Sequence, residues 1–243
     1  MVKNLTYKQF GAKAILIKWE PVIDDEILKD ILLFKEKILT KDSIEFVDLI
    51  QGYHSLTITY KNYISNFENE VFILKSIYNS NLKERKQTYF QWEIPVCYDV
   101  EFGIDLKEIS QHSNIEINQI IKLHSEGVYK IYFIGFLPGF LYLGGLNEQL
   151  FFDRKRNPRL NVAKGSVGIG GKQTGVYPND SAGGWNIIGK TPVNFFDLKN
   201  DNPCFAKAGD LIKFKPISLN EFQQLEKDVA LNPYQISKTL QDA

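Results

Sequence analysis

Cysteine, histidine and long apolar runs are scarce in this chain. It has two cysteines and three histidines among 243 residues, too few for a disulfide framework or a zinc site at ligand spacing. The longest apolar run without charges, residues 131–146, is shorter than the roughly 20 residues of a membrane-spanning helix. The first ten residues lack the apolar core of a signal peptide. We therefore expect a reduced, cytoplasmic protein without a metal site or a membrane partner.

The chain also lacks an excess of either charge sign. Lysine plus arginine and aspartate plus glutamate each number 29, so the formal net charge is zero. General nucleic-acid binders and binders of anionic membranes are usually basic. The balance argues against both classes of partner, although a local charged pocket is compatible with it.

Apolar patterning in the first hundred residues predicts a small α/β domain. Strands are expected at residues 14–19, 44–50, 54–60 and 88–98, and helices at 24–39 and 66–82. In the third strand, Leu56, Ile58 and Tyr60 alternate strictly with polar residues, as on a half-buried strand. The order βαββαβ is that of a ferredoxin-like unit, so we predict such a domain over residues 1–98.

The remainder of the chain changes character and predicts a β-barrel. Two short helices are expected first, at residues 105–111 and from Ser113, where Ser113 to Glu116 fit a capping box. Short apolar runs separated by Gly, Pro, Asn and Asp then favour an all-β barrel. The expected strands are 128–134, 149–152, 160–163, 167–169, 185–188, 193–196 and 211–214, followed by a helix at 221–229. We therefore predict an α+β protein whose second domain spans residues 99–243.

Twelve of the seventeen glycines lie between Gly135 and Gly189, where the backbone must turn tightly or approach a partner closely. Residues 184–191 read GWNIIGKT and match the nucleotide P-loop pattern. A P-loop follows a buried strand and opens a helix, whereas the polar segment PNDSAG precedes this one. Trp185 and Ile187 alternate as they would on a strand. We therefore predict a strand here, beside a pocket shaped by glycine turns.

His124 is a candidate catalytic residue at the end of an apolar helical face. An imidazole titrates near neutral pH, so it can serve as a general base or give a proton to a leaving nitrogen. The alternative is a partly buried histidine that the helix dipole favours at a C-terminus. The sequence leaves both interpretations open.

The glycine-rich region supplies five further candidates. Glycines flank Lys172 and Gln173, and a lysine there can neutralise a carboxylate or phosphate, or else remain a solvated loop charge. Asp180 is either a ligand to a substrate amide or a turn residue. Tyr177 and Trp185 either line a pocket or belong to the core.

The longest motifs read IGFLPGFLYLGGL, PRLNVAKGSVGIGGKQTGVYPNDSAGGWNIIGKTP and AGDLIKFKPI. With them the chain resembles the family of 5-oxoprolinase B subunits and KipI, also called allophanate hydrolase subunit 1. The resemblance spans nearly the whole chain and implies a small N-terminal α/β domain followed by a cyclophilin-like β-barrel. Two departures are Leu141, where the family usually has proline, and Lys190, which is commonly arginine.

The resemblance also implies a function. Family members form, with subunits A and C, an ATP-dependent complex that opens 5-oxoproline to glutamate. It implies that ATP is used by the complex and that Lys172, a candidate catalytic residue, and Gln173 contact the substrate. Because the chain lacks a convincing nucleotide site of its own, we expect it to be inactive alone. His124 would then transfer a proton, while Tyr177, Asp180 and Trp185 shape the pocket.

Two other functions share this fold, and fold alone does not choose between them. KipI-like members are regarded as inhibitors of histidine-kinase autophosphorylation, which requires a docking surface and no chemistry. A third role is a carboxyltransferase-like part acting on urea-type amides, since the family is also found fused into urea-carboxylating enzymes.

Overall fold

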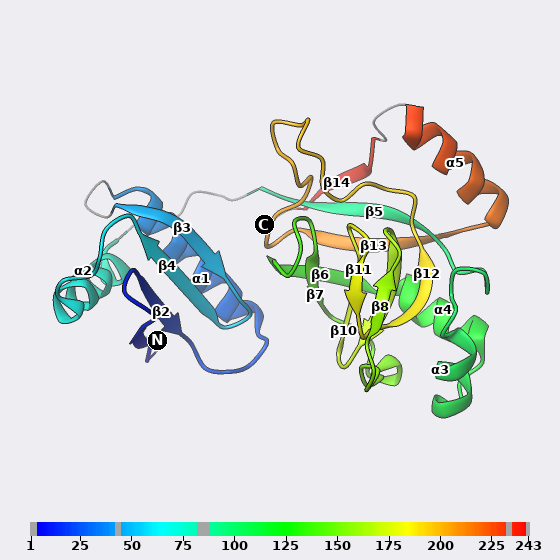
Figure 1. Cartoon of the computed structure of the whole chain (residues 1–243), viewed down its shortest axis with the longest axis horizontal. Helices are drawn as coiled ribbons and strands as arrows, with labels where there is room; N and C mark the ends of the chain where they lie inside the picture. The colour runs from blue at the N-terminus through cyan, green and yellow to red at the C-terminus, as the bar shows by residue number, and fades with distance from the viewer. Residues whose placement is uncertain (1–3, 42–44, 82–87, 232–234, 242–243) are drawn as a thin grey trace. The chain divides into compact units, whose positions relative to one another are not determined.

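The computed structural model describes residues 4–41, 45–81, 88–231 and 235–241. The chain divides into two compact units, Met1–Lys86 and Gln87–Ala243 (Figure 1). No helix among the described residues is long and apolar enough to cross a membrane.

The first unit is a four-stranded antiparallel sheet with two helices. Its elements are β1 (Thr6–Gln9), β2 (Ala14–Lys18), α1 (Asp25–Leu39), β3 (Phe46–Gln51), β4 (Ser55–Tyr60) and α2 (Phe67–Asn79). The sheet order is β1-β2-β4-β3, and the two helices pack on it through a shared apolar core. Strand β4 buries every second residue, as the sequence predicted.

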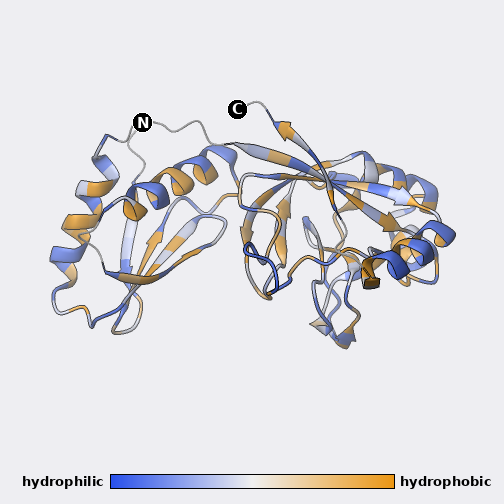
Figure 2. Cartoon of the chain, turned by 90° about the horizontal axis from the view of Figure 1, so that it is seen from above, coloured by the Kyte–Doolittle hydropathy of each residue, from blue (hydrophilic) through white to orange (hydrophobic). Residues whose placement is uncertain are grey.

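Local sequence explains where helix α1 begins and which face it buries. Asp24 is its N-cap, and the Oδ1 of Asp24 accepts hydrogen bonds from the backbone N–H groups of Glu26 (2.8 Å) and Ile27 (3.0 Å). This satisfies two of the donors that a helix N-terminus leaves free. Hydrophobic and hydrophilic bands alternate along both helices of this unit (Figure 2), which is the amphipathic pattern that sheet packing requires.

The larger unit is built around an eight-stranded sheet. Its strands run β10-β9-β12-β5-β13-β6-β7, and β14 pairs with β5. The terminal strands β7 and β10 lie side by side, so the sheet is a nearly closed barrel. The strand bounds are β5 (Tyr89–Cys97), β6 (Val128–Ile134), β7 (Leu141–Gly144), β9 (Ser166–Gly170), β10 (Gln173–Val176), β12 (Asn186–Lys190), β13 (Leu211–Ile217) and β14 (Ser237–Gln241).

The remaining elements of this unit lie outside the barrel sheet. They are the helices α3 (Leu106–Ser113), α4 (Ile117–Glu126) and α5 (Leu219–Leu231), the 3₁₀ turn η1 (Glu148–Leu150), and strands β8 (Arg159–Val162) and β11 (Ser181–Gly183). Strands β8 and β11 pair as a separate antiparallel ribbon.

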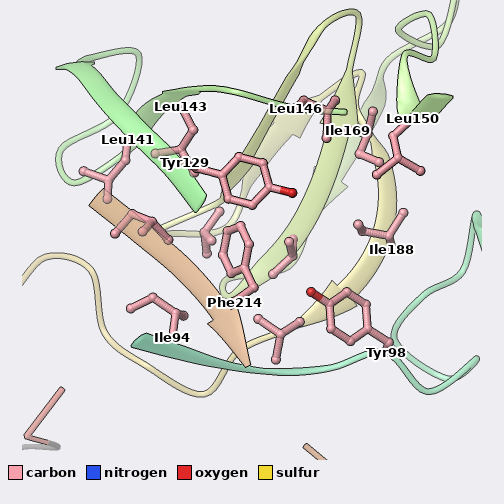
Figure 3. Packing of buried hydrophobic residues seen from close by; sticks show 14 of the residues in the cluster. Ile94, Tyr98, Tyr129, Leu141, Leu143, Leu146, Leu150, Ile169, Ile188 and Phe214 are labelled. Carbon is pink, nitrogen blue, oxygen red and sulfur yellow. The ribbon is translucent and has the colours of Figure 1, made fainter. Parts of the chain in front are cut away.

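The barrel interior is a packed apolar core and not a channel. Tyr98, Tyr129 and Phe214 point into it, with Phe214 between the two tyrosines (Figure 3). Aliphatic side chains from the surrounding strands and loops complete the cluster, among them Leu141, Leu143, Ile169 and Ile188. Because side chains fill this interior, a ligand site must lie at the surface of the barrel.

The position of β5 corrects the ferredoxin-like prediction for residues 1–98. This strand was expected to complete the sheet of the first domain, but it pairs with β13 in parallel and with β12 and β14. The larger unit therefore begins before residue 98, and the edge beside β2 is occupied by the unpredicted strand β1. Alternation along a strand indicates its buried face but not the sheet that it joins.

Three local predictions in the second half are also wrong. The capping box does not form, because Ser113 is the last residue of α3 and its hydroxyl donates to the carbonyl oxygen of Ile109. Asn114 then takes a left-handed conformation, with φ of 56°, which ends the helix. Residues 149–152 form the turn η1 and a single bridge, and residues 193–196 form no strand.

The prediction for GWNIIGKT is confirmed. Asn186–Lys190 form strand β12, which pairs antiparallel with β9. The segment opens no helix, so it lacks the geometry of a phosphate-binding loop.

Candidate functional site

A cleft of about 630 Å³ lies on the larger unit. Helix α3 contributes Glu108 and His112, and the segment after η1 contributes Phe151 to Arg156. The β9–β10 turn adds Gly171 and Lys172, and β12 adds its first residue, Asn186. Reciprocal backbone hydrogen bonds between Phe152 and Gly171, of 2.8 and 3.1 Å, hold the loop against the turn. Four separate segments thus converge on one hollow.

The cleft is cationic although the chain as a whole is neutral. Its basic side chains are Arg154, Lys155, Arg156 and Lys172, and its acidic ones are Glu108 and Asp153. Clefts lined by one sign of charge concentrate ions of the opposite sign. The lining therefore favours a small anion such as a carboxylate or phosphate.

Lys155 is held in the cleft wall by two carboxylates. Its Nζ lies 2.7 Å from the Oε2 of Glu108 and 3.1 Å from the Oδ1 of Asp105. Partial burial opposes the charged form, but these hydrogen bonds outweigh it and raise the pKa of Lys155. Lys155 therefore stays protonated and fixes the loop to α3, with most of its charge already neutralised.

Asp105 organises the wall behind this lysine. Its buried carboxylate also binds Arg159, at 2.6 Å, and accepts a hydrogen bond of 2.6 Å from the backbone N–H of Ile187. Main chain adds a further link, because the N–H of Asp105 donates to the carbonyl oxygen of Ile187. The start of α3 is thereby tied to strand β12, which carries Asn186.

Arg154 is held in place without a carboxylate. Its guanidinium donates to the Oε1 of Gln173 at 3.3 Å and lies 5.6 Å from the centre of the Trp185 ring. No acidic partner of Arg154 occurs among the described residues. A planar guanidinium that is oriented but uncompensated suits bidentate recognition of a carboxylate.

Asn186 presents a buried hydrogen-bond acceptor beside the same cleft. The residue is 1% exposed, and its Nδ2 donates to the carbonyl oxygens of Asp153 (2.8 Å) and Ile169 (3.4 Å). Two carbonyl partners fix the amide orientation, since only the NH₂ group can donate to them. The Oδ1 atom has no partner in the part of the chain that the structure describes.

A second hollow of about 310 Å³ adjoins the first and shares Arg154 and Lys155 with it. Its other walls are largely aromatic and include Phe140, Tyr142, Tyr177 and Trp185. Tyr177 and Trp185 are buried and belong to a small apolar cluster. They therefore line a hollow and also pack as core, which combines the two interpretations that the sequence offered.

The structure places the other glycine-region candidates differently. Lys172 lines the cationic cleft, with its Nζ 5.5 Å from the centre of the Phe151 ring. Gln173 positions Arg154. Asp180 lines neither hollow, and its Oδ1 accepts a hydrogen bond of 2.7 Å from the backbone N–H of Lys164, which favours the structural interpretation.

His124 lies in the barrel interior, away from both hollows. Its Nδ1 accepts from the hydroxyl of Tyr98 at 2.7 Å, and its Nε2 lies 2.8 Å from the Oγ1 of Thr174. Because Thr174 donates its own proton to the carbonyl oxygen of Gly168, the Nε2 of His124 must be the donor. Burial lowers the pKa of His124 to about 3. A neutral ring with both nitrogens engaged favours the structural interpretation.

Sequence reasoning missed Arg154, Lys155 and Asn186. The segment from Asp153 to Arg159 places four basic residues within six positions of a neutral chain, and this local charge run was the available signal. Nothing in the sequence distinguished Asn186, because its role depends on carbonyl groups from two other segments. No group of three potential metal ligands occurs in residues 4–41, 45–81, 88–231 and 235–241.

Comparison with known protein families adds a consistent set of matches. The family model described as carboxyltransferase domain, subdomain C and D, matches residues 5–206. The 5-oxoprolinase B subunit of Bacillus subtilis (strain 168) is 32% identical over 238 residues, covering 94% of this chain and 99% of that protein. The 5-oxoprolinase B subunit of Escherichia coli O157:H7 is 35% identical over 206 residues, covering 85% and 93%.

Solved structures share the fold. The crystal structure of TTHA0988 has a TM-score of 0.73 and 28% identity, and the match covers 85% of this chain but only 40% of that chain. The K. lactis urea amidolyase structure has a TM-score of 0.82 over 98% of this chain at 18% identity, covering 16% of that chain. This second match shows a common fold and no more.

Proposed function

Because this chain belongs to the carboxyltransferase-domain (subdomain C and D) family that includes the 5-oxoprolinase B subunits, we propose that it is the B subunit of an ATP-dependent 5-oxoprolinase. The reaction would open 5-oxo-L-proline to L-glutamate by adding water across the lactam C–N bond. We further propose that subunits A and C complete the enzyme and that this chain is inactive alone. The observation that carries the proposal is identity to the Bacillus subtilis protein along almost the full length of both chains.

The chemistry explains what such a complex must provide. A lactam carbonyl is stabilised by resonance, so water attacks it slowly, and phosphorylation of its oxygen by ATP would create a better electrophile and a leaving group. The ring must meanwhile be held by its carboxylate and oriented. The cationic cleft suits this holding role, since it offers basic side chains and a buried amide acceptor.

The residues of this chain supply less of the bond-breaking chemistry. His124 is enclosed, and burial lowers its pKa, while GWNIIGKT is a strand; both observations support a role for this chain other than proton transfer or nucleotide binding. This division supports a binding and orienting role for this chain, with ATP handled in the partner subunits.

The relatives do not favour the alternative functions. The two curated relatives that match at 32% and 35% identity are both named as B subunits of 5-oxoprolinase. The match to urea amidolyase at 18% identity extends only to the fold. These two relatives therefore give no support to inhibition of a histidine kinase or to action on urea-type amides.

Purification with candidate A and C subunits tests the proposal. We expect the assembled complex to hydrolyse ATP only when 5-oxoproline is present and to release glutamate in equal amount, while this chain alone does neither. Gel filtration before the assay verifies assembly. A verified complex that shows no 5-oxoproline-dependent ATP hydrolysis would contradict the assigned role.

A further inference from the structure

The cationic cleft carries an inference that rests on the proposed function and assigns residues to substrate recognition. We propose that this cleft binds the cyclic substrate through two groups. Arg154 holds the substrate carboxylate, and the Oδ1 of Asn186 accepts a hydrogen bond from the ring N–H. The cleft thereby selects ligands that combine a carboxylate with a lactam N–H.

The first argument is the unpaired acceptor of Asn186. Buried polar atoms in native proteins nearly always have a partner, and a buried atom without one costs about 1–3 kcal/mol. The Oδ1 of Asn186 has none among the described residues, although the residue is 1% exposed and lines the cleft. Its NH₂ group is committed to two backbone carbonyls, so the amide cannot flip to satisfy the oxygen. A ligand that donates an N–H would give this oxygen the hydrogen bond that it lacks.

The second argument is the uncompensated charge of Arg154. Lys155 shares the cleft but is already paired with Asp105 and Glu108. Arg154 instead donates to the neutral amide of Gln173 and lies over the ring of Trp185. These contacts orient the guanidinium without cancelling its charge. An oriented guanidinium binds carboxylates through two parallel hydrogen bonds.

Both residues line the same cleft, and one hydrogen-bond network holds them. The carbonyl oxygen that binds the Asn186 amide is that of Asp153, the residue immediately before Arg154. The loop that carries Arg154 is anchored through Lys155 to Asp105, which is bonded to Ile187, the neighbour of Asn186. A ligand bridging the carboxylate and N–H sites therefore meets residues fixed by the same network.

Two substrate analogues separate the two contacts. 2-Pyrrolidinone keeps the lactam N–H and lacks the carboxylate, whereas 5-oxotetrahydrofuran-2-carboxylate keeps the carboxylate and replaces the N–H with oxygen. Assembled complexes that carry wild-type chain, Arg154→Gln or Asn186→Ala are compared. The KM for 5-oxoproline is measured from turnover, and the affinity of each analogue is measured from its inhibition of 5-oxoproline turnover.

We expect Arg154→Gln to raise the KM for 5-oxoproline at least about tenfold, because the variant loses a charge-assisted hydrogen bond to the carboxylate. The affinity for 2-pyrrolidinone, which has no carboxylate, should stay unchanged. Asn186→Ala should raise the KM for 5-oxoproline by a similar factor and leave the affinity for the lactone unchanged. Lys227→Gln and Asn194→Ala, which alter residues outside the cleft, are matched controls and should keep wild-type constants.

The outcomes distinguish the inference from the proposed function. A complex that turns over 5-oxoproline, and whose Arg154 and Asn186 variants keep wild-type KM and wild-type discrimination, would overturn the inference alone. A wild-type complex that neither turns over nor binds 5-oxoproline would overturn both. If Asn186→Ala fails to assemble, Arg154→Gln decides the matter, because Arg154 is exposed and its replacement leaves the core intact.

Discussion

At the scale of single residues, the surroundings of His124 determine its protonation. Its ring stacks on Phe214 with centroids 4.7 Å apart and planes at 17°, and lies between the polar groups of Tyr98 and Thr174. Protonation would place a charge in this apolar interior and would turn the accepting Nδ1 into a second donor. Burial accordingly lowers the pKa to about 3.

This shift predicts a specific pH dependence of stability. The unfolded chain binds a proton at His124 near pH 6.5, whereas the folded chain stays neutral until about pH 3. The contribution of the neutral His124 ring to the free energy of unfolding is therefore fully present above pH 6.5. It is lost as pH falls toward 3, at about 1.4 kcal/mol per pH unit. A His124→Gln variant should be less stable at pH 7.5, and its deficit relative to wild type should shrink toward pH 4.

Urea unfolding of both proteins at pH 7.5, 6, 5 and 4 measures the difference. The exposed Asn194, which does not titrate, is replaced by alanine as the control, and its difference from wild type should be the same at every pH. A His124→Gln deficit that stays constant from pH 7.5 to 4 would contradict the neutral, enclosed ring.

Sequence patterns identified candidate residues better than they assigned roles. The glycine turns drew attention to Lys172, which lines the cleft, and to Gln173, which accepts a hydrogen bond from Arg154; a role for either residue in substrate binding stays a prediction. The choice between roles for His124 remained open because its environment comes from Tyr98, Thr174 and Phe214. These residues are distant in sequence, so no local sequence pattern shows that they lie together in the fold.

At the scale of elements, the β9–β10 hairpin shows how two adjacent glycines serve different purposes. The loop consists of Gly171 and Lys172, with φ of 65° at Gly171, as the first central position of a type II′ turn requires. A Cβ on Gly171 would meet open space, whereas a Cβ on Gly170 would overlap the indole ring of Trp185. One glycine provides a backbone conformation and the other provides room for an aromatic ring.

The pair therefore predicts two substitutions of unequal cost. Gly171→Ala should lower the free energy of unfolding by about 1 kcal/mol, the strain of a left-handed alanine. Gly170→Ala should cost about 2–3 kcal/mol more, because Trp185 is packed against Phe140 and Arg154 and its displacement disturbs a filled cluster. Thermal unfolding gives both values, and tryptophan fluorescence should shift only in Gly170→Ala. Equal costs for the two variants would contradict this division of roles.

Period-two alternation recovered several strands, but it did not reveal their partners. Residues 54–60 and 128–134 were predicted within one residue of their observed bounds. Strand β5 was recognised as well, yet its neighbours β12, β13 and β14 follow it by about a hundred residues or more. Such pairings depend on the assembled core and not on local spacing.

At the scale of the whole molecule, the assignment of β5 determines where the chain can be divided. The strand contributes Trp92, Ile94 and Val96 to the core of the larger unit and pairs with three of its strands. Burial of each such side chain contributes about 1.5–3 kcal/mol, against a total domain stability of about 5–15 kcal/mol. The larger unit therefore depends on residues that lie before position 98.

Two fragments test this dependence. Residues 87–243 should fold alone and unfold cooperatively in urea, because they retain the complete barrel sheet. Residues 99–243, which begin at the boundary expected from the sequence, should lack a cooperative transition, since β12, β13 and β14 lose their shared partner. Circular dichroism with urea titration compares the fragments under identical conditions. Adding a synthetic peptide of residues 87–98 should restore a transition to the shorter fragment, whereas cooperative unfolding of residues 99–243 without that peptide would show that β5 is dispensable.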